Sequence, residues 1–166
     1  MDSVTIYIGL GSNIGDRLAN LRRGFSLLTQ TFDVVCTSSI YETEPWGYLN
    51  QPKFLNAVIQ ATTTKQPFDI LSALKLAEMA TGRVDDGTRW GPRIFDADLL
   101  FYGNQVYKTY DLEIPHPRIK ERAFVLIPLA EIAPTFVDPV SHETIQRLTD
   151  LVDGQGEVKL CPGLRL

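Results

Sequence analysis

The spacing of apolar residues predicts a series of strands and helices through the first two thirds of the chain. Apolar and polar residues alternate at the start, as in a strand with one buried face, and then recur three or four positions apart, as on a helix. Both patterns return further along, with Pro67 at the start of the second helix and Gly82 at its end. The predicted elements are strands over 4–10, 34–41, 54–63 and 95–102 and helices over 18–28 and 67–82.

The order of these elements predicts the fold class. Strand–helix–strand–strand–helix–strand is the order of an α+β protein with a ferredoxin-like βαββαβ core. Such a core is an antiparallel sheet with helices packed on one face, so the other face stays open to ligands. The later pattern adds a short strand near Val106, a helix over 123–133 with Pro128 at a kink or near its start, and a last helix over 144–152. No linker or repeat interrupts the chain, so we expect a single domain over residues 1–166 with these extra C-terminal strands and helices.

Composition and charge narrow the range of partners. A hydrophobic share of 44% with 22% charged residues is ordinary for a soluble globular protein. A net charge of −4 argues against general binding to nucleic acid or to an anionic membrane, and no apolar run approaches membrane-spanning length. Cys36 and Cys161 lie far apart, and residues 1–13 do not form a secretory signal. We therefore expect unpaired thiols and a cytoplasmic protein.

The strand over 95–102 places two carboxylates on one face. Asp96 and Asp98 are two residues apart, so their side chains point the same way. The opposite, core-facing side of this strand is expected to carry Phe95, Ala97, Leu99 and Phe101. Two carboxylates this close repel each other unless a cation lies between them, and a hard cation with oxygen ligands fits best. Arg89 and Arg93 flank a Trp-Gly-Pro turn before the strand, and guanidinium groups beside acidic metal ligands suit a magnesium–nucleotide complex.

The strand over 54–63 is expected to complete the open face of the sheet. Its alternating side chains fall into two sets, with Leu55, Ala57, Ile59 and Ala61 on one face and Phe54, Asn56 and Val58 on the other. Phe54 and Asn56 are therefore predicted to share a face with Asp96 and Asp98.

Two loops flank this face. The loop over 42–52 is too long for a plain hairpin, and long ordered loops on a rigid scaffold tend to be functional. The glycine turn over 11–16 lacks the lysine of a phosphate-binding loop. We interpret its glycines as turn residues and Asp16 as the residue that begins the following helix.

Several strings of this chain resemble those of one enzyme family. The string R-W-G-P-R-I-F-D-A-D-L-L-F-Y at 89–102 is similar to the signature of the 6-hydroxymethyl-7,8-dihydropterin pyrophosphokinases. Further similar strings cover nearly the whole chain: G-S-N-I-G at 11–15, T-E-P-W-G at 43–47, Q-P-K-F-L-N at 51–56, P-H-P-R at 115–118 and R-A-F-V-L at 122–126. In that family a hydroxymethyl group attacks the β-phosphorus of ATP. The resemblance therefore implies transfer of a pyrophosphoryl group and release of AMP in folate biosynthesis.

The resemblance also implies roles for individual residues. Asp96 and Asp98 match the two metal ligands and, with Arg83 and Arg93, form the expected catalytic set. The implied ATP-binding residues are Glu78, Arg83, Trp90, Arg93, Leu99, His116 and Arg122. The implied pterin-binding residues are Thr43, Pro45, Trp46, Phe54, Asn56, Asp96 and Phe124, of which the two phenylalanines stack on the ring. The implied cofactor is Mg²⁺, as two ions bound with the co-substrate ATP, and the implied partners are ATP and the pterin, bound by a monomer.

Some positions depart from the family pattern. Asp85 stands where the family usually carries a second basic residue two positions after Arg83, and Asp86 follows it. A carboxylate there would repel the phosphates of ATP. Asp111 and Glu113 likewise make the approach to His116 acidic.

Two other classes of protein fit parts of the sequence. A nucleotidyl transferase of the polymerase-palm type also carries paired aspartates on a ferredoxin-like sheet, but this acidic chain leaves little basic surface for a template. A ferredoxin-like module that only binds a small molecule or RNA would not need Asp96 and Asp98, and the aromatic RNA-binding string is absent. Of the two histidines, His116 taken alone fits a loop residue bonded to backbone as well as a ligand-binding residue, and His142 is interpreted as a surface residue.

Overall fold

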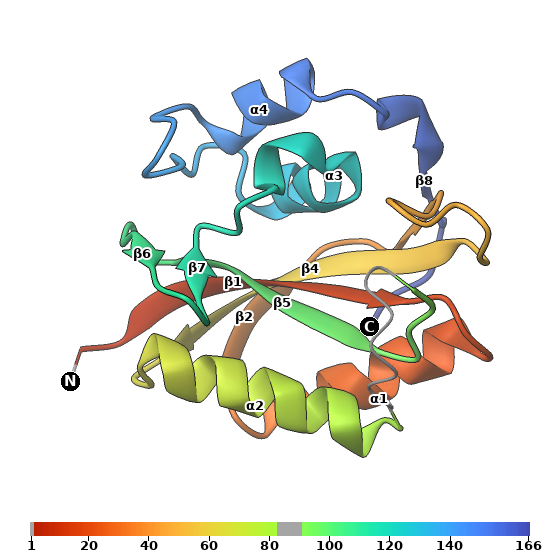
Figure 1. Cartoon of the computed structure of the whole chain (residues 1–166), viewed down its shortest axis with the longest axis horizontal. Coiled ribbons are helices and arrows are strands. Elements are labelled where there is room, and N and C mark those ends of the chain that lie inside the picture. The colour runs from red at the N-terminus through yellow and green to blue at the C-terminus, as the bar shows by residue number, and fades with distance from the viewer. Residues whose placement is uncertain (1, 83–90) are drawn as a thin grey trace.

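The computed structural model describes residues 2–82 and 91–166 of the chain (Figure 1). In these ranges six strands form one antiparallel sheet in the order β5–β1–β4–β3–β8, and β2 also pairs with β4. The strands of this sheet are β1 (Val4–Ser12), β2 (Asp33–Thr37), β3 (Tyr41–Thr43), β4 (Phe54–Thr63), β5 (Asp96–Tyr102) and β8 (Val158–Leu160). A second small sheet pairs β6 (Tyr107–Lys108) with β7 (Glu113–Ile114). The helices are α1 (Arg17–Thr29), α2 (Pro67–Ala80), α3 (Ala123–Ile132) and α4 (Ile145–Leu151), with short 3-10 turns η1 (Ile119–Glu121) and η2 (Gln155–Glu157).

The element order confirms the predicted α+β fold with its βαββαβ core. The predicted strand over 34–41 is divided into β2 and β3, because a serine side chain interrupts the ladder there. The Ser38 N–H donates to the Val58 carbonyl at 2.8 Å, while the Ser38 hydroxyl oxygen accepts from the Val58 N–H at 2.9 Å. The hydroxyl thus takes the place of a backbone carbonyl opposite β4, and the chain turns away before β3.

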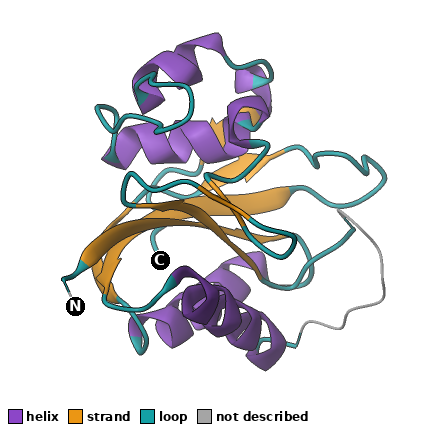
Figure 2. Ribbon diagram, turned by 60° about the vertical axis from the view of Figure 1, so that its left-hand side comes forward, coloured by secondary structure: helices purple, strands orange, loops and turns teal. Residues whose placement is uncertain are grey.

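Helices lie on both sides of the main sheet (Figures 1 and 2). α1 and α2 pack on one face over a core that includes Ile8, Ile59 and Leu74. α3 and α4 lie on the opposite side, where a second core joins α3 to β4 and β5. The C-terminal helices, expected as additions to the core, cover part of the face that was predicted to stay open to ligands, and the rest of that face is uncovered. Within the described ranges, no helix is both long and apolar enough to cross a membrane.

A β-bulge in β5 changes the face to which its last residues point. Tyr7 pairs with Phe101 and Ile8 pairs with Leu99, so Leu100 is an extra residue in the ladder. Beyond the bulge the alternation is reversed, and Phe101 enters the second core, with its ring centroid 4.8 Å from that of Phe136. The prediction that Phe101 shares a face with Leu99 is wrong for this reason. For Phe95, Ala97 and Leu99 the predicted core face is confirmed.

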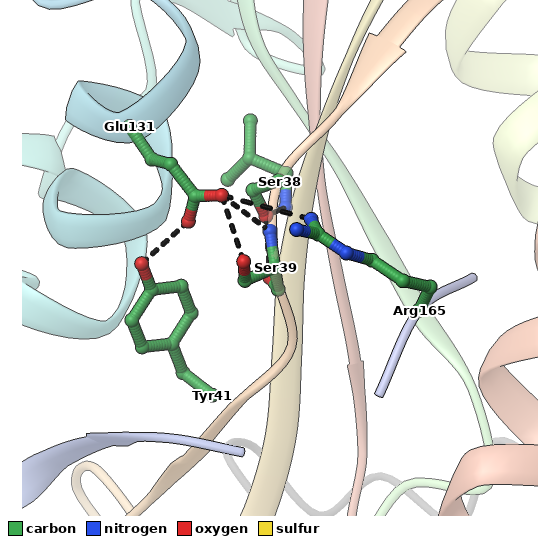
Figure 3. A network of polar contacts seen from close by, with 6 residues as sticks. Ser38, Ser39, Tyr41, Glu131 and Arg165 are labelled. Atoms are coloured by element: carbon green, nitrogen blue, oxygen red, sulfur yellow. Dashed lines mark hydrogen bonds and ion pairs between the residues drawn. The ribbon is translucent and has the colours of Figure 1, made fainter. Parts of the chain in front are cut away.

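Helix α3 is fastened to the sheet through one carboxylate (Figure 3). Glu131 accepts hydrogen bonds from the Ser39 N–H at 2.9 Å, the Ser39 hydroxyl at 2.8 Å and the Tyr41 hydroxyl, and it lies 3.8 Å from the Arg165 guanidinium. Burial alone would raise the pKa of Glu131, but these hydrogen bonds and the charge of Arg165 outweigh it and lower that pKa. Burial and the bond to Glu131 raise the pKa of Tyr41. The contacts hold α3 against the break between β2 and β3.

Candidate active site

A cavity of about 330 Å³ lies on the part of the second sheet face that α3 and α4 leave uncovered. Its floor is formed by β1, β4 and β5, and its walls come from the loop after β3 and from the segment between β7 and α3. Most of the predicted site residues line it: Thr43, Trp46, Phe54, Asn56, Arg93, Asp96, Asp98, His116, Arg122 and Phe124. The structure thus brings together side chains from segments that are far apart in the sequence.

The remaining predicted residues lie elsewhere or are not described. Pro45 lines an adjoining cavity of about 290 Å³, while Leu99 is buried in the core beneath the sheet. Glu78, on α2, is also on that far side, where its carboxylate accepts a 2.9 Å hydrogen bond from the Ala97 N–H. Roles of Glu78 and Leu99 in binding ATP stay predictions. The predicted residues Arg83 and Trp90, and also Asp85, Asp86 and Arg89, lie outside the described residues.

The glycines at 9 and 11 on β1 differ in whether the floor of the cavity leaves room for a side chain. Gly11 pairs with Asn56 on one side and with Asp96 on the other. A Cβ atom at Gly11 would lie 2.8 Å from Asn56 Oδ1 and 3.4 Å from Phe54 Cδ1, so a side chain there would displace the Asn56 amide. A Cβ atom at Gly9 would meet only the Leu100 side chain, at 3.5 Å, which is an ordinary contact.

The Asn56 amide is held in one orientation. Its Nδ2 donates to the Thr43 hydroxyl at 2.6 Å, and both residues are buried. With Nδ2 bonded to Thr43, Oδ1 is the amide atom that lies toward Gly11. A flat heterocycle with its own donors and acceptors would find a fixed polar partner here.

The acidic and basic residues of the cavity meet at Arg122. Its Nη1 lies 3.8 Å from Asp98 Oδ2, and its buried Nε has no hydrogen-bond partner within the described part of the chain. Burial lowers the pKa of Arg122, and the charges of Asp98 and Asp96 oppose that effect. An arginine stays charged near neutral pH even so. A buried cation of this kind beside two carboxylates is suited to an anionic ligand that carries its own metal ion.

Aromatic rings flank the same guanidinium. The Arg122 carbon Cζ lies 5.0 Å from the ring centroid of Trp46 and 5.6 Å from that of Phe124. Arg118 also lies over the Trp46 ring, with its Cζ 5.3 Å from the ring centroid. Arg118 lines the cavity, although it was not among the site residues predicted from the P-H-P-R string.

His116 is held as a neutral imidazole. Its backbone N–H donates to the carbonyl of the bulged residue Leu100 at 3.1 Å, which fixes its position at the cavity. Burial and then the charge of Arg122 lower the pKa of His116 to about 4. The Arg118 N–H lies 3.3 Å from Nδ1, and Arg122 Nη1 lies 3.4 Å from Nε2. Both groups can only donate, and a neutral imidazole has one acceptor nitrogen, so His116 accepts from one of the two and carries its proton on the other nitrogen.

Asp96 and Asp98 are the candidate metal ligands. Among the described residues, no group of three or more His, Cys, Asp or Glu side chains converges on one point. This donor set fits magnesium nonetheless, because protein sites for Mg²⁺ commonly use one or two carboxylates and take their other ligands from phosphates and water.

The fold and the cavity together define an α+β domain with a ferredoxin-like core, whose sheet face presents paired carboxylates, arginines and aromatic rings. The family model for 7,8-dihydro-6-hydroxymethylpterin-pyrophosphokinase (HPPK) matches residues 7–134. The chain belongs to this family.

Curated relatives cover much of the chain. The chain is 48% identical over 128 residues to the 2-amino-4-hydroxy-6-hydroxymethyldihydropteridine pyrophosphokinase of Bacillus subtilis, which covers 76% of each protein. It is 37% identical to the enzyme of the same name from Aquifex aeolicus over 142 residues, 86% of this chain and 88% of that protein. It is 38% identical to the folic acid synthesis protein FOL1 of Dictyostelium discoideum over 95% of this chain, but it spans only 24% of that longer protein.

A solved structure supports the fold. The Plasmodium falciparum HPPK-DHPS triple mutant matches 90% of this chain and 44% of its own chain, with a TM-score of 0.72 and 17% sequence identity. At this identity the likeness concerns the fold alone, and it agrees with the sheet and helix arrangement described above.

Proposed function

We propose that this chain transfers a pyrophosphoryl group from ATP to the hydroxymethyl group of 6-hydroxymethyl-7,8-dihydropterin and releases AMP, a step in folate biosynthesis. The observation that supports the proposal is that two kinds of side chain, suited to different ligands, line one cavity. Carboxylates and guanidinium groups suited to a magnesium–nucleotide complex lie beside aromatic rings and a fixed amide suited to a pterin: Asp96, Asp98, Arg93, Arg122, Phe54, Asn56 and Phe124.

The nucleotide side is defined by charge. Arg93 and Arg122 line the cavity and would bind the phosphates of ATP, with the neutral ring of His116 beside Arg122. Asp96 and Asp98 would hold the two magnesium ions together with the phosphate oxygens. When bound, these ions neutralise phosphate charge and align the phosphates for an in-line displacement.

The pterin side is defined by shape and hydrogen bonding. Phe54 and Phe124 both line the cavity, and their faces would stack on the flat ring. Asn56, with its amide fixed by Thr43, would pair with the donors and acceptors at the ring edge. Trp46 covers Arg122 from the loop side and would shield the reacting groups from water.

In the reaction, a bond forms between the hydroxymethyl oxygen and the β-phosphorus, and the bond from the β-phosphorus to the oxygen shared with the α-phosphorus breaks. The hydroxyl proton passes to water, and AMP leaves with the oxygen that joined the α- and β-phosphorus atoms. The chain's own contribution is to hold the two substrates in line and to stabilise the charge that develops on the phosphate oxygens, mainly through Arg93 and Arg122.

Two further points belong to the proposal. Action as a monomer is proposed from the family resemblance alone. Cys36 and Cys161 are free thiols, which suits a reducing compartment such as the cytoplasm.

The experiment that tests this function is product analysis. The protein is incubated with ATP, Mg²⁺ and 6-hydroxymethyl-7,8-dihydropterin, and nucleotides are separated by chromatography. We expect AMP to accumulate only when the pterin is present, in equal amount to the pterin consumed. Accumulation of ADP, or no transfer at all, contradicts the proposal. In a parallel incubation with added nucleic acid, release of inorganic pyrophosphate with incorporation of AMP into that nucleic acid would instead indicate a nucleotidyl transferase.

A further inference from the structure

Three segments of the chain meet at a single buried side chain that does not line the cavity. Asn13, directly after β1, is only 2% exposed. Its Nδ2 donates to the Gln51 side-chain oxygen at 2.9 Å and to the Pro52 carbonyl at 3.0 Å. Its Oδ1 accepts from the Arg93 N–H at 2.7 Å, and its own backbone N–H donates to the Arg93 carbonyl at 3.0 Å. One amide thus uses both of its ends to join two different loops.

These two loops carry opposite sides of the site. The segment over 44–53 leads from Thr43 to Phe54, and it carries Trp46 on the cavity wall. The segment over 91–95 carries Arg93 and leads directly into Asp96. The first belongs to the pterin side and the second to the nucleotide side, so a shift of either segment changes the hydrogen bonds that Asn13 makes to the other.

The connection continues inside the pterin-side loop. Gln51, which accepts from Asn13, donates through its Nε2 to the Tyr48 carbonyl at 2.6 Å. These two hydrogen bonds therefore link Asn13, through Gln51, to the Tyr48 carbonyl within the loop. The amide of Asn13 is suited to this because it has both donors and an acceptor, whereas aspartate offers acceptors only.

We propose that Asn13 is a positioning residue that couples the two halves of the site: a ligand that orders one segment favours, through Asn13, the arrangement of the other segment that binds the second ligand. The coupling is reciprocal, because two ligands that favour the same arrangement each raise the affinity for the other by the same factor. The inference rests on the proposed function for the identity of the two ligands, but the contacts at Asn13 do not depend on it.

The first test uses the unliganded protein and does not depend on function. Amide hydrogen exchange is measured by mass spectrometry for the wild-type protein and for Asn13→Ala, Asn13→Asp and Gln51→Ala. We expect Asn13→Ala to speed exchange in both segments, 44–53 and 91–95. Asn13→Asp keeps the acceptor for the Arg93 N–H, and Gln51→Ala removes only a loop contact, so both should speed exchange in 44–53 alone.

The matched control is Asn20→Ala. Asn20 also makes a local side-chain hydrogen bond near this turn, from its Nδ2 to the Ile14 carbonyl at 2.7 Å, but it joins neither segment. We expect it to leave both segments unchanged. Exchange that rises equally throughout β1 and β4 in Asn13→Ala would show general loss of stability and would overturn the positioning role. If Asn13→Ala does not fold, Asn13→Asp takes its place, and exchange in 44–53 that stays at the wild-type rate then overturns the role of the Asn13 amide.

The second test measures the coupling itself. The dissociation constant of the pterin is determined by calorimetry with and without Mg²⁺ and an ATP analogue in which a methylene replaces the oxygen that would be cleaved. The coupling ratio is the pterin dissociation constant without the analogue divided by the constant with it. We expect this ratio to be well above one for the wild-type protein and at least fivefold smaller for Asn13→Ala, given that typical coupling factors are about 5 to 150. Asn20→Ala should keep the wild-type ratio.

The outcomes separate this inference from the proposed function. A wild-type ratio of one, or an unchanged ratio in Asn13→Ala, overturns the coupling while leaving the function standing. If the wild-type protein binds neither ligand, the proposed function fails, and the exchange experiment alone decides the role of Asn13: unchanged exchange in either segment of Asn13→Ala then overturns it.

Discussion

Substituting one glycine on the floor of the cavity should separate pterin binding from nucleotide binding. In Gly11→Ala the new methyl group would lie 2.8 Å from Asn56 Oδ1, closer than a carbon atom and an oxygen atom can approach. The backbone at Gly11 needs no left-handed conformation, so the strand itself accepts alanine. The Asn56 amide must therefore turn away, which breaks its 2.6 Å hydrogen bond to Thr43.

The free-energy cost of this movement comes from the buried polar groups that it leaves without a hydrogen-bond partner. Thr43 and Asn56 are both buried, and a buried polar group that loses its partner costs about 1 to 3 kcal/mol. If the bound pterin depends on the original orientation of the amide, its dissociation constant should rise by about 5- to 150-fold, at 1.4 kcal/mol for each factor of ten. The affinity for MgATP should hardly change, because the contact lies on the pterin side.

Gly9→Ala is the matched control, since it adds the same methyl group to the same face of β1 two residues earlier. Its Cβ would meet Leu100 at 3.5 Å, an ordinary contact, so pterin affinity should change by less than about threefold, or below 1 kcal/mol. Calorimetry with the pterin and with MgATP gives both constants for each variant. Equal effects of the two substitutions, or an unchanged pterin constant in Gly11→Ala, would refute the argument that the Asn56 amide sets pterin binding.

Three other predictions concern the carboxylates, the aromatic wall and the contact that fastens α3. Asp96→Asn and Asp98→Asn should each lower kcat by at least about 100-fold without changing the circular dichroism spectrum, because each would remove a charged oxygen ligand that we propose for the metal ions; near-normal turnover at saturating Mg²⁺ would refute their role. Phe124→Ala should weaken pterin binding by about 1 to 3 kcal/mol, by analogy with the stacking of bases on aromatic side chains, and an equal loss of MgATP affinity by calorimetry would show a structural role instead. Glu131→Gln should lower the melting temperature at pH 7, since the amide leaves hydrogen-bond donors such as the Tyr41 hydroxyl poorly matched. Because folding lowers the pKa of Glu131 below its ordinary 4.5, its contribution is present above that pH and is lost as the pH falls through the folded-state pKa; thermal melts across this range should therefore show a smaller acid-side loss in the variant.

The sequence pattern predicted the part of the site that depends on strand alternation. Side chains two residues apart on a strand share a face whatever surrounds them, so Phe54 and Asn56 were placed on the same side as Asp96 and Asp98, and all four line the cavity. The resemblance to the pyrophosphokinases supplied the residues of the walls, such as His116 and Phe124, which come from segments without a simple pattern.

The features that the pattern missed depend on contacts between distant residues. The bulge at Leu100 reverses the alternation, so Phe101 lies opposite to its predicted face. The hydroxyl of Ser38 ends β2 by bonding to β4, which propensity along the chain does not reveal. The convergence of two loops on Asn13 likewise appears only when the residues around 51 and 93 are placed in space.

A crystal structure with both ligands bound would test the central claim, that one cavity holds both substrates in line for pyrophosphoryl transfer. The protein would be crystallised with Mg²⁺, the uncleavable methylene analogue of ATP and 6-hydroxymethyl-7,8-dihydropterin. We expect the pterin to lie between Phe54 and Phe124 with its edge at Asn56, the metal ions at Asp96 and Asp98, and the hydroxymethyl oxygen facing the β-phosphorus opposite the methylene bridge. A pterin bound outside this cavity, or a nucleotide whose γ-phosphorus rather than β-phosphorus faces the hydroxymethyl oxygen, would contradict the claim.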